Sequence, residues 1–253
     1  DPHFAHGRQR SRRRAVAVAA WRTLLLPLAF GWVFSAVAVV MLAALVAPQF
    51  ILRTQQRWVR SLGVVSCWLL GIKIRIENPE RLAQLQGQIL AFNHINMLDL
   101  IVLASLWQRG WSAIYKQEFN SIPLIGRTMQ FLGLLPIDRR NRAAAVATLA
   151  NAAEVIRAEH KTLLVAPEGT RSNSEQLGPF KTGPFHLASE LKVPMVPMLM
   201  QGNARAMRGL LVYGGTVTIK LLAPIDTSHW HSDNVAAQLH STRQRFLDGL
   251  GQQ

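Results

Sequence analysis

The chain divides into a long apolar segment near its N-terminus and a longer part in which apolar and polar positions alternate. From Thr23 to Leu52 there is no charged residue, and residues 23–47 are almost wholly apolar. At about 1.5 Å per residue, a helix of residues 23–47 would be about 37 Å long, which is enough to cross a hydrocarbon core of about 30 Å. The pattern therefore predicts a membrane helix.

A second helical pattern follows, with one apolar and one basic side. The apolar stripe consists of Trp58, Leu62, Val65, Leu69 and Ile72, and the basic stripe of Arg53, Arg57 and Arg60. Such a two-sided helix is typical of a membrane surface, and the roughly 12 apolar residues after Arg60 are too few to cross the bilayer again. We therefore predict an N-terminal helical hairpin in one leaflet, with a single span and a soluble buried hairpin as alternatives.

Beyond Gly71 the pattern becomes that of a soluble domain. Strict alternation over residues 72–77, ended by Asn78 and Pro79, predicts a half-buried strand. Further apolar stretches predict strands at 88–92, 111–115, 133–137, 162–166 and 194–200, and helical patterns predict helices at 97–107, 123–132 and 142–159. A hairpin around Gly214 and Gly215 and a C-terminal helix from about Asp233 complete the pattern. Alternating strands and helices predict an α/β fold, a layered sheet flanked by helices.

Charge supports the membrane interpretation. The chain has 253 residues and a net charge of +14, and nine arginines against Asp1 place +8 of that charge in residues 1–60. A basic excess suits nucleic acid or an anionic membrane surface, and its coupling to an apolar segment, without a nucleic-acid-binding motif, favours the membrane. Cys67 is the only cysteine, which excludes an internal disulfide and a multi-cysteine metal site. We expect no metal site.

His94 and Asp99 form the first candidate for chemistry. They are five residues apart, and five helical steps turn about 500°, so the pair can meet only across a loop-to-helix junction, with Asn96 as the helix cap. A carboxylate against one imidazole nitrogen fixes the tautomer and makes the other nitrogen a general base. The alternative is structural: Asp99 would cap backbone amides and His94 would pack.

Basic residues follow two other predicted strands. One strand ends at Ile137 and is followed by Asp138, Arg139 and Arg140; another ends before the segment PEGTR, residues 167–171. Ligands of open α/β sheets gather beyond the carboxyl ends of the strands, so His94, Arg139 and Arg171 are expected to converge. Two arginines and a lysine suit a phosphate ester, although each alone could be a solvated surface charge and Glu168 could simply pair with Arg171.

Four segments in order, NHINMLD, GLLPIDR, PEGTRS with FKTG, and VPMVP, resemble the blocks of the glycerolipid acyltransferase family, specifically bacterial 1-acylglycerol-3-phosphate acyltransferases. The resemblance implies a glycerol-3-phosphate acyltransferase-like fold. From the pattern along the chain we expect a basic tail (1–22), membrane-anchoring helices (23–71) and a catalytic domain (72–253). It implies that His94 is the base and Asp99 its partner, and that residues 194–197 line the acyl channel or shape the site. The substrate-binding residues it implies are Asn93, Lys116, Arg139, Glu168, Gly169, Thr170, Arg171 and Lys181. The sequence departs from the common pattern at Asn96, where serine is frequent, and at Pro136.

The resemblance further implies an enzyme of phospholipid synthesis. The sn-2 hydroxyl of lysophosphatidic acid would attack an acyl thioester on coenzyme A or an acyl carrier protein and give phosphatidic acid, with no cofactor and no covalent acyl-enzyme. We expect the chain at an anionic bacterial inner membrane, with its catalytic domain on the cytoplasmic face. The alternatives are acylation of another lyso-lipid (a lyso-ornithine lipid or a lysophosphoethanolamine), a thioesterase-like hydrolase, and a non-catalytic lipid-binding membrane protein.

Overall fold

The central sheet has the strand order β1-β9-β6-β2-β5-β3-β4. The computed structural model describes residues 20–138 and 140–252. The strands are β1 (Ile72–Glu77), β2 (Ile89–Phe92), β3 (Trp111–Lys116), β4 (Leu135–Ile137), β5 (Thr162–Val165), β6 (Met195–Gln201) and β9 (Gly215–Leu221). Neighbours are parallel except β6 and β9, which are antiparallel. The carboxyl ends of β6, β2, β5, β3 and β4 therefore meet at the same edge of the sheet.

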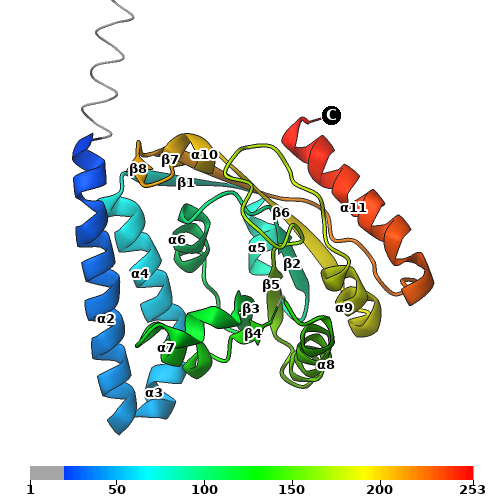
Figure 1. Cartoon of the computed structure of the whole chain (residues 1–253), viewed down its shortest axis with the longest axis horizontal. Coiled ribbons are helices and arrows are strands. Elements are labelled where there is room, and N and C mark those ends of the chain that lie inside the picture. The colour runs from blue at the N-terminus through cyan, green and yellow to red at the C-terminus, as the bar shows by residue number, and fades with distance from the viewer. Residues whose placement is uncertain (1–19, 139, 253) are drawn as a thin grey trace, which may run out of the picture.

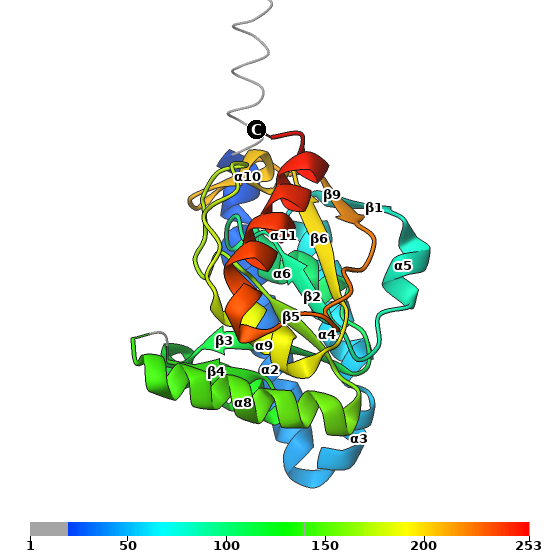
Figure 2. The same ribbon diagram turned by 90° about the vertical axis from the view of Figure 1, so that its right-hand side faces the viewer.

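Helices cover both faces of this sheet (Figure 1; Figure 2). One face carries α4 (Gln55–Leu69) and α6 (Leu98–Ser105), and the other carries α8 (Arg142–Glu159), α9 (Gly183–Leu191) and α11 (Val235–Leu250). The two cores follow from strand alternation. Leu90 and Phe92 of β2 pack with the α4 and α6 side, whereas Ile89 and Ala91 pack with the α8, α9 and α11 side.

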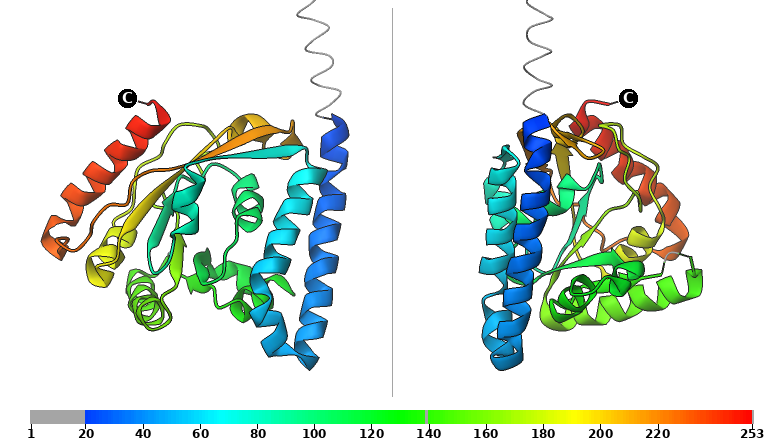
Figure 3. Two further views of the ribbon diagram at one scale, coloured as in Figure 1. Left: turned by 180° about the vertical axis from the view of Figure 1, so that it is seen from behind. Right: turned by 60° about the vertical axis from the view of Figure 1, so that its left-hand side comes forward.

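The N-terminal helices form a hairpin beside the first of these faces. Helix α2 (Leu26–Val46) runs the length of the domain, α3 (Pro48–Arg53) makes the turn, and α4 returns beside α2 (Figure 3). The helix over Ala20–Val46 is long and apolar enough to cross a membrane, and only 11% of its most apolar 18-residue window is buried. The predicted helical hairpin is therefore present, with the outer face of α2 open to its surroundings.

The face by which α4 joins the domain differs from the predicted stripe. Its buried residues are Val59, Gly63, Ser66 and Cys67, whereas the stripe residues on this helix, Trp58, Leu62, Val65 and Leu69, are only half-buried. The reason is close packing of two backbones: a Cβ atom at Gly63 would lie 2.1 Å from the backbone nitrogen of Ser105 in α6. Small side chains, rather than the large apolar ones, select this face.

The remaining elements are short. They are α5 (Pro79–Ala83), η1 (Gln117–Ser121), α7 (Ile125–Phe131), α10 (Asn203–Ala206), β7 (Met207–Arg208), β8 (Leu211–Val212) and η2 (Ser232–Asn234). Strands β7 and β8 form a separate two-stranded sheet. Directly after β6, α10 and this small sheet bring polar residues to the carboxyl edge of the main sheet.

Each predicted strand and helix is observed, apart from the late hairpin, whereas α5, α9 and α10 were not predicted. Strand 72–77 is β1, the other five predicted strands are β2 to β6, the three predicted helices are α6, α7 and α8, and the C-terminal helix begins at Val235. The hairpin prediction at Gly214 and Gly215 was wrong: the tip is at Gly209 and Leu210, between β7 and β8. Instead, Gly214 (φ +70°) and Gly215 (φ +125°) turn the chain into β9, where the Gly215 N–H donates to the Gly71 carbonyl (3.0 Å).

Candidate active site

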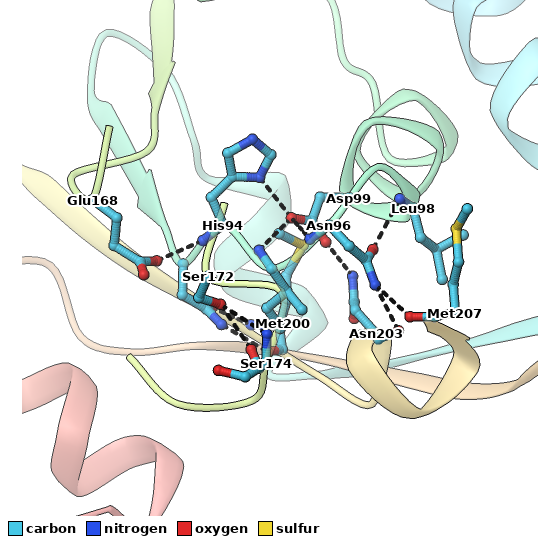
Figure 4. Close-up of polar contacts among 12 residues, drawn as sticks. His94, Asn96, Leu98, Asp99, Glu168, Ser172, Ser174, Met200, Asn203 and Met207 are labelled. Carbon is cyan, nitrogen blue, oxygen red and sulfur yellow. Dashed lines mark hydrogen bonds and ion pairs between the residues drawn. The ribbon is translucent and has the colours of Figure 1, made fainter. Parts of the chain in front are cut away.

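The predicted contact between His94 and Asp99 is observed. His94 lies in the loop after β2, and Asp99 lies in the first turn of α6. The His94 Nδ1 atom is 2.6 Å from Asp99 Oδ2, and the exposed fractions of the two side chains are 15% and 0% (Figure 4). No hydrogen bond joins His94 Nε2 to another residue in the described part of the chain. The imidazole is therefore held from one side and open on the other.

Four donors surround the Asp99 carboxylate. Besides His94, Oδ2 accepts from the backbone N–H groups of Ile95 (2.6 Å) and Asn96 (3.1 Å). The other oxygen, Oδ1, accepts from the side-chain amide of Asn203 (2.6 Å). A fully buried carboxylate needs such donors, because an unpaired buried charge is strongly unfavourable. The arrangement keeps the proton on His94 Nδ1 and leaves Nε2 as an acceptor.

Asn96 was predicted as the N-cap of α6, but the N-cap is Met97, and Asn96 lies directly before it. Its Oδ1 accepts from the Leu98 N–H (3.0 Å), where α6 begins. Its amide group donates to the backbone carbonyls of Asn203 (3.0 Å) and Met207 (2.9 Å). One side chain therefore fixes the start of α6 and joins it to α10 and β7.

Glu168 supports His94 through the backbone. Its carboxylate accepts from the His94 N–H (2.7 Å) and from the Gly178 N–H (2.8 Å), and the residue is 3% exposed. Burial raises the pKa of Glu168, and the two backbone N–H groups partly offset this shift. Both oxygens are occupied, and no ion pair with Arg171 occurs among residues 20–138 and 140–252. Glu168 therefore positions the His94 backbone, and its contact with substrate stays a prediction.

Asn93, which was predicted to contact substrate, forms two hydrogen bonds with the backbone of β6. Its side-chain amide donates to the Met200 carbonyl (2.9 Å), and its Oδ1 accepts from the Met200 N–H (2.7 Å). The residue is 3% exposed. Asn93 therefore fastens the end of β2 to β6, immediately before His94.

The predicted basic residues lie at neighbouring strand ends. Arg171 and Lys181 are exposed. The Ser172 N–H donates to the His94 carbonyl (2.9 Å), so Arg171, the residue before Ser172, lies close to His94. Lys116 ends β3, and its Nζ lies 3.0 Å from Glu118 Oε1 in an ion pair. The hydrogen bond that Lys116 donates lowers the pKa of Glu118. Strands β2, β5 and β3 are adjacent, so three of the predicted strand ends converge. Arg139 lies outside the described residues.

Gly169 and Thr170 occupy the turn after β5. Gly169 has φ +69°, which disfavours any residue with a side chain, and a Cβ there would lie 3.2 Å from Lys181 Cγ. Thr170 is exposed beside Arg171. The glycine therefore lets the 166–171 turn pass close to Lys181 and presents the following polar residues outward.

Two residues that the sequence analysis missed complete the site. Asn203 is fully buried and donates to Asp99, and Glu175 accepts from the N–H groups of Gly202 and Ala204, both at 3.1 Å. Glu175 thereby holds the start of α10, on which Asn203 lies. A signal existed in the sequence, because Asn203 follows the apolar strand at 195–201, as His94 follows its own. Nowhere in the described residues do three or more His, Cys, Asp or Glu side chains gather as metal ligands would.

A family model described as "Acyltransferase" matches residues 73–201, which contain the His94–Asp99 pair and the turn at Gly169. The chain belongs to the acyltransferase family. One relative, a 1-acyl-sn-glycerol-3-phosphate acyltransferase of Salmonella typhimurium, is 31% identical over 66% of this chain and 68% of its own length. A coconut (Cocos nucifera) protein of the same name is 30% identical over 74% of this chain, and the match spans 61% of the coconut protein.

The fold of this acyltransferase has a counterpart of known structure. The 1-acyl-sn-glycerophosphate (LPA) acyltransferase of Thermotoga maritima superposes with a TM-score of 0.72 at 20% sequence identity, covering 93% of this chain and 98% of the other. The predicted α/β fold is therefore confirmed. The family and the bacterial relatives also confirm the resemblance inferred from the four motifs.

Proposed function

We propose that this acyltransferase transfers an acyl group to the sn-2 hydroxyl of lysophosphatidic acid and forms phosphatidic acid. The observation that carries the proposal is the 2.6 Å contact of His94 with the fully buried Asp99, which leaves Nε2 free to act as a base. The Salmonella and coconut relatives are 1-acyl-sn-glycerol-3-phosphate acyltransferases. Such a base needs a hydroxyl acceptor, and the surrounding basic residues favour one that carries phosphate.

The reaction follows from the geometry of the pair. His94 Nε2 takes the proton of the acceptor hydroxyl as its oxygen attacks the thioester carbonyl carbon. The buried Asp99 carboxylate stabilises the imidazolium that forms. The tetrahedral intermediate collapses, the carbon–sulfur bond breaks, and His94 returns the proton to the departing thiolate. Atoms and charge balance without a covalent acyl-enzyme.

The acceptor phosphate would bind at the ends of β5 and β3. Arg171 and Lys181 are exposed there, and guanidinium groups match phosphate oxygens in charge and shape. Lys116 would bind the phosphate and give up its ion pair with Glu118. The loss of this pair costs little, because ion pairs that are exposed to solvent are weak. Arg139 joins this set only by the family resemblance.

The acyl donor would be a thioester of coenzyme A or of an acyl carrier protein, and the reaction would need no cofactor. An exposed basic edge attracts either donor, because coenzyme A carries phosphates and carrier proteins are acidic. Both donors are cytoplasmic compounds. Their use therefore favours placement of the catalytic domain on the cytoplasmic face of the bacterial inner membrane.

The N-terminal hairpin would lie in one leaflet. The catalytic domain lies beside the full length of α2, with α4 between them (Figure 3). If α2 crossed the bilayer upright, it would carry polar surfaces of the domain into hydrocarbon, where unpaired polar groups are very unfavourable. A helix parallel to the membrane avoids this cost and keeps the lipid acceptor near His94.

The test is acyl transfer by the purified full chain in detergent or vesicles, followed by lipid mass spectrometry. Lysophosphatidic acid, lysophosphatidylethanolamine and a lyso-lipid without phosphate are offered in parallel, with acyl-CoA and acyl carrier protein as donors. Transfer to lysophosphatidic acid should be preferred and lost in His94→Ala. Preference for the acceptor without phosphate, or thioester hydrolysis in the absence of any acceptor, would overturn the assignment.

A further inference from the structure

The tip of the β7–β8 hairpin exposes two adjacent leucines. Leu210 is 65% exposed and Leu211 is 49% exposed. Arg208 on β7 and Arg205 on α10 are also exposed, and no acidic residue occurs between them and Leu211. An apolar tip flanked by arginines is unfavourable in water, but it suits the boundary between lipid headgroups and acyl chains.

These leucines are distinct among the side chains that the structure describes. Among the side chains described after Ile122, they are the only large apolar ones that are exposed. The others lie in the N-terminal helices, except Leu100 on α6 and Ile122 before α7. No large apolar side chain described in α8, α9 or α11 is exposed, so the apolar surface gathers on the side of the molecule that carries α2.

The hairpin is attached to the beginning of the apolar helix. The Val212 N–H of β8 donates to Thr23 Oγ1 (3.1 Å), and the Arg22 guanidinium donates to the Tyr213 carbonyl. Beside these contacts Trp21 and Leu24 are 66% and 69% exposed. Figure 1 and Figure 3 both place β7, β8 and α10 at this end of α2. The apolar surface of α2 thus continues onto the hairpin.

We propose that the β7–β8 hairpin is a second membrane-binding element, whose occupant is an anionic phospholipid bilayer. Leu210 and Leu211 enter the interface beside α2, and Arg205 and Arg208 contact the lipid phosphates. The inference rests on the proposed membrane placement of α2, but not on the reaction or on the acceptor.

The position of the hairpin links the membrane to the catalytic pair. Its first strand begins at Met207, whose carbonyl accepts from Asn96, and the preceding α10 carries Asn203, which holds Asp99. A bilayer in contact with the hairpin therefore lies next to the elements that orient the base. A lipid acceptor could reach His94 by lateral movement along this surface.

The proposal can be tested with an environment-sensitive fluorophore on Leu210→Cys. The natural Cys67 is 4% exposed, so a maleimide dye will label position 210 selectively in the folded full chain. The matched control is Gln244→Cys, an exposed position on α11, across the sheet from α2 (Figure 1). Vesicles of phosphatidylethanolamine and phosphatidylglycerol should shift the emission at position 210 to shorter wavelength and leave position 244 unchanged.

Co-sedimentation with the same vesicles completes the test. The double variant Leu210→Ser/Leu211→Ser should bind about tenfold more weakly, the change expected from about 1.4 kcal/mol of lost apolar burial. Unchanged emission at position 210 while the labelled protein sediments with vesicles would overturn the proposal. A concentration-dependent shift without lipid would also overturn it, in favour of contact between two copies. Neither readout involves acyl transfer, so this inference can fail while the proposed reaction stands.

Discussion

Replacing Asp99 with asparagine separates the roles of the carboxylate. The two oxygens of Asp99 now accept from four donors: His94 Nδ1, the N–H groups of Ile95 and Asn96, and the amide of Asn203. An asparagine offers one oxygen and one NH₂ group in the same space. In either orientation, at least one buried donor faces another donor.

Each orientation has a definite cost. If the new NH₂ group faces Asn203, one buried hydrogen bond is lost, at about 1–3 kcal/mol. If it faces His94 instead, it also faces the N–H groups of Ile95 and Asn96, and the imidazole must place its proton on Nε2, so the base disappears. A wrong tautomer of this kind lowers kcat by about 10⁴ in a well-studied serine protease. The first orientation opposes fewer donors and keeps the proton on Nδ1, so it removes only the charge that stabilises the imidazolium. We expect kcat to fall at least about tenfold, and by up to about 10⁴ to the extent that the second orientation is populated. Tm should fall by roughly 2–4 °C for each kcal/mol lost.

The assay is thiol release from acyl-CoA in the presence of lysophosphatidic acid, with thermal unfolding of the same samples. The control is the double variant Asp99→Asn/Asn203→Asp, in which the new NH₂ group donates to a carboxylate at position 203. Tm should recover, whereas kcat should recover only in part, because the negative charge is now farther from the imidazole. A folded Asp99→Asn variant with kcat within tenfold of the wild type would refute the proposed role of the Asp99 carboxylate.

Arg171→Ala should lower kcat/KM for lysophosphatidic acid about 10–100-fold, because a charge-assisted contact with the phosphate is lost. The same variant should leave kcat/KM for an acceptor without phosphate unchanged, and Arg245→Ala, at another exposed arginine, is the control. Equal losses on both acceptors would contradict a phosphate-binding role of Arg171. Burial raises the pKa of Glu168, so the folded state favours its protonated form. The stability of the wild type relative to Glu168→Gln should therefore be highest below about pH 4.3 and decline as pH rises through the raised pKa. A difference in Tm between the two proteins that stays constant across this pH range would disprove the prediction. Gly63→Leu should destabilise the fold by about 1–3 kcal/mol, because its Cβ would lie 2.1 Å from the Ser105 nitrogen. Gly31→Ala should not destabilise it, because a Cβ there meets nothing within 4 Å. Denaturant unfolding of the two variants measures the difference.

The elements of the fold could be predicted because their signals are local. Alternation at residues 72–77 and the apolar run at 162–166 reflect the period of a half-buried strand and the burial of a central one, and both strands are found. The contact of His94 with Asp99 could also be predicted, since both residues lie within one short junction. The face of α4 could not, because it depends on the approach of two backbones at Gly63 and Ser105.

The supporting residues of the site were harder to predict because they come from distant parts of the chain. Asn203 is 104 residues from Asp99, and Glu168 is 74 residues from His94. One sequence does not give such pairings, since many polar residues follow apolar strands. Asn93 was predicted to bind substrate only because it lies next to His94 in the motif. The structure shows that its side chain fastens β2 to β6, a contact that its position in the sequence does not reveal.

The fastening of β2 to β6 by Asn93 has a consequence for protein engineering. His94 is supported from the end of β5 through Glu168, and Asp99 from the end of β6 through Asn203, so the pair is aligned only while these strands keep their offset. A short graft of residues 93–99 into another scaffold would carry the motif without its alignment. The smallest transplantable unit is instead a set of three neighbouring strand ends with their loops, and designers who seek this chemistry would need to copy all three together.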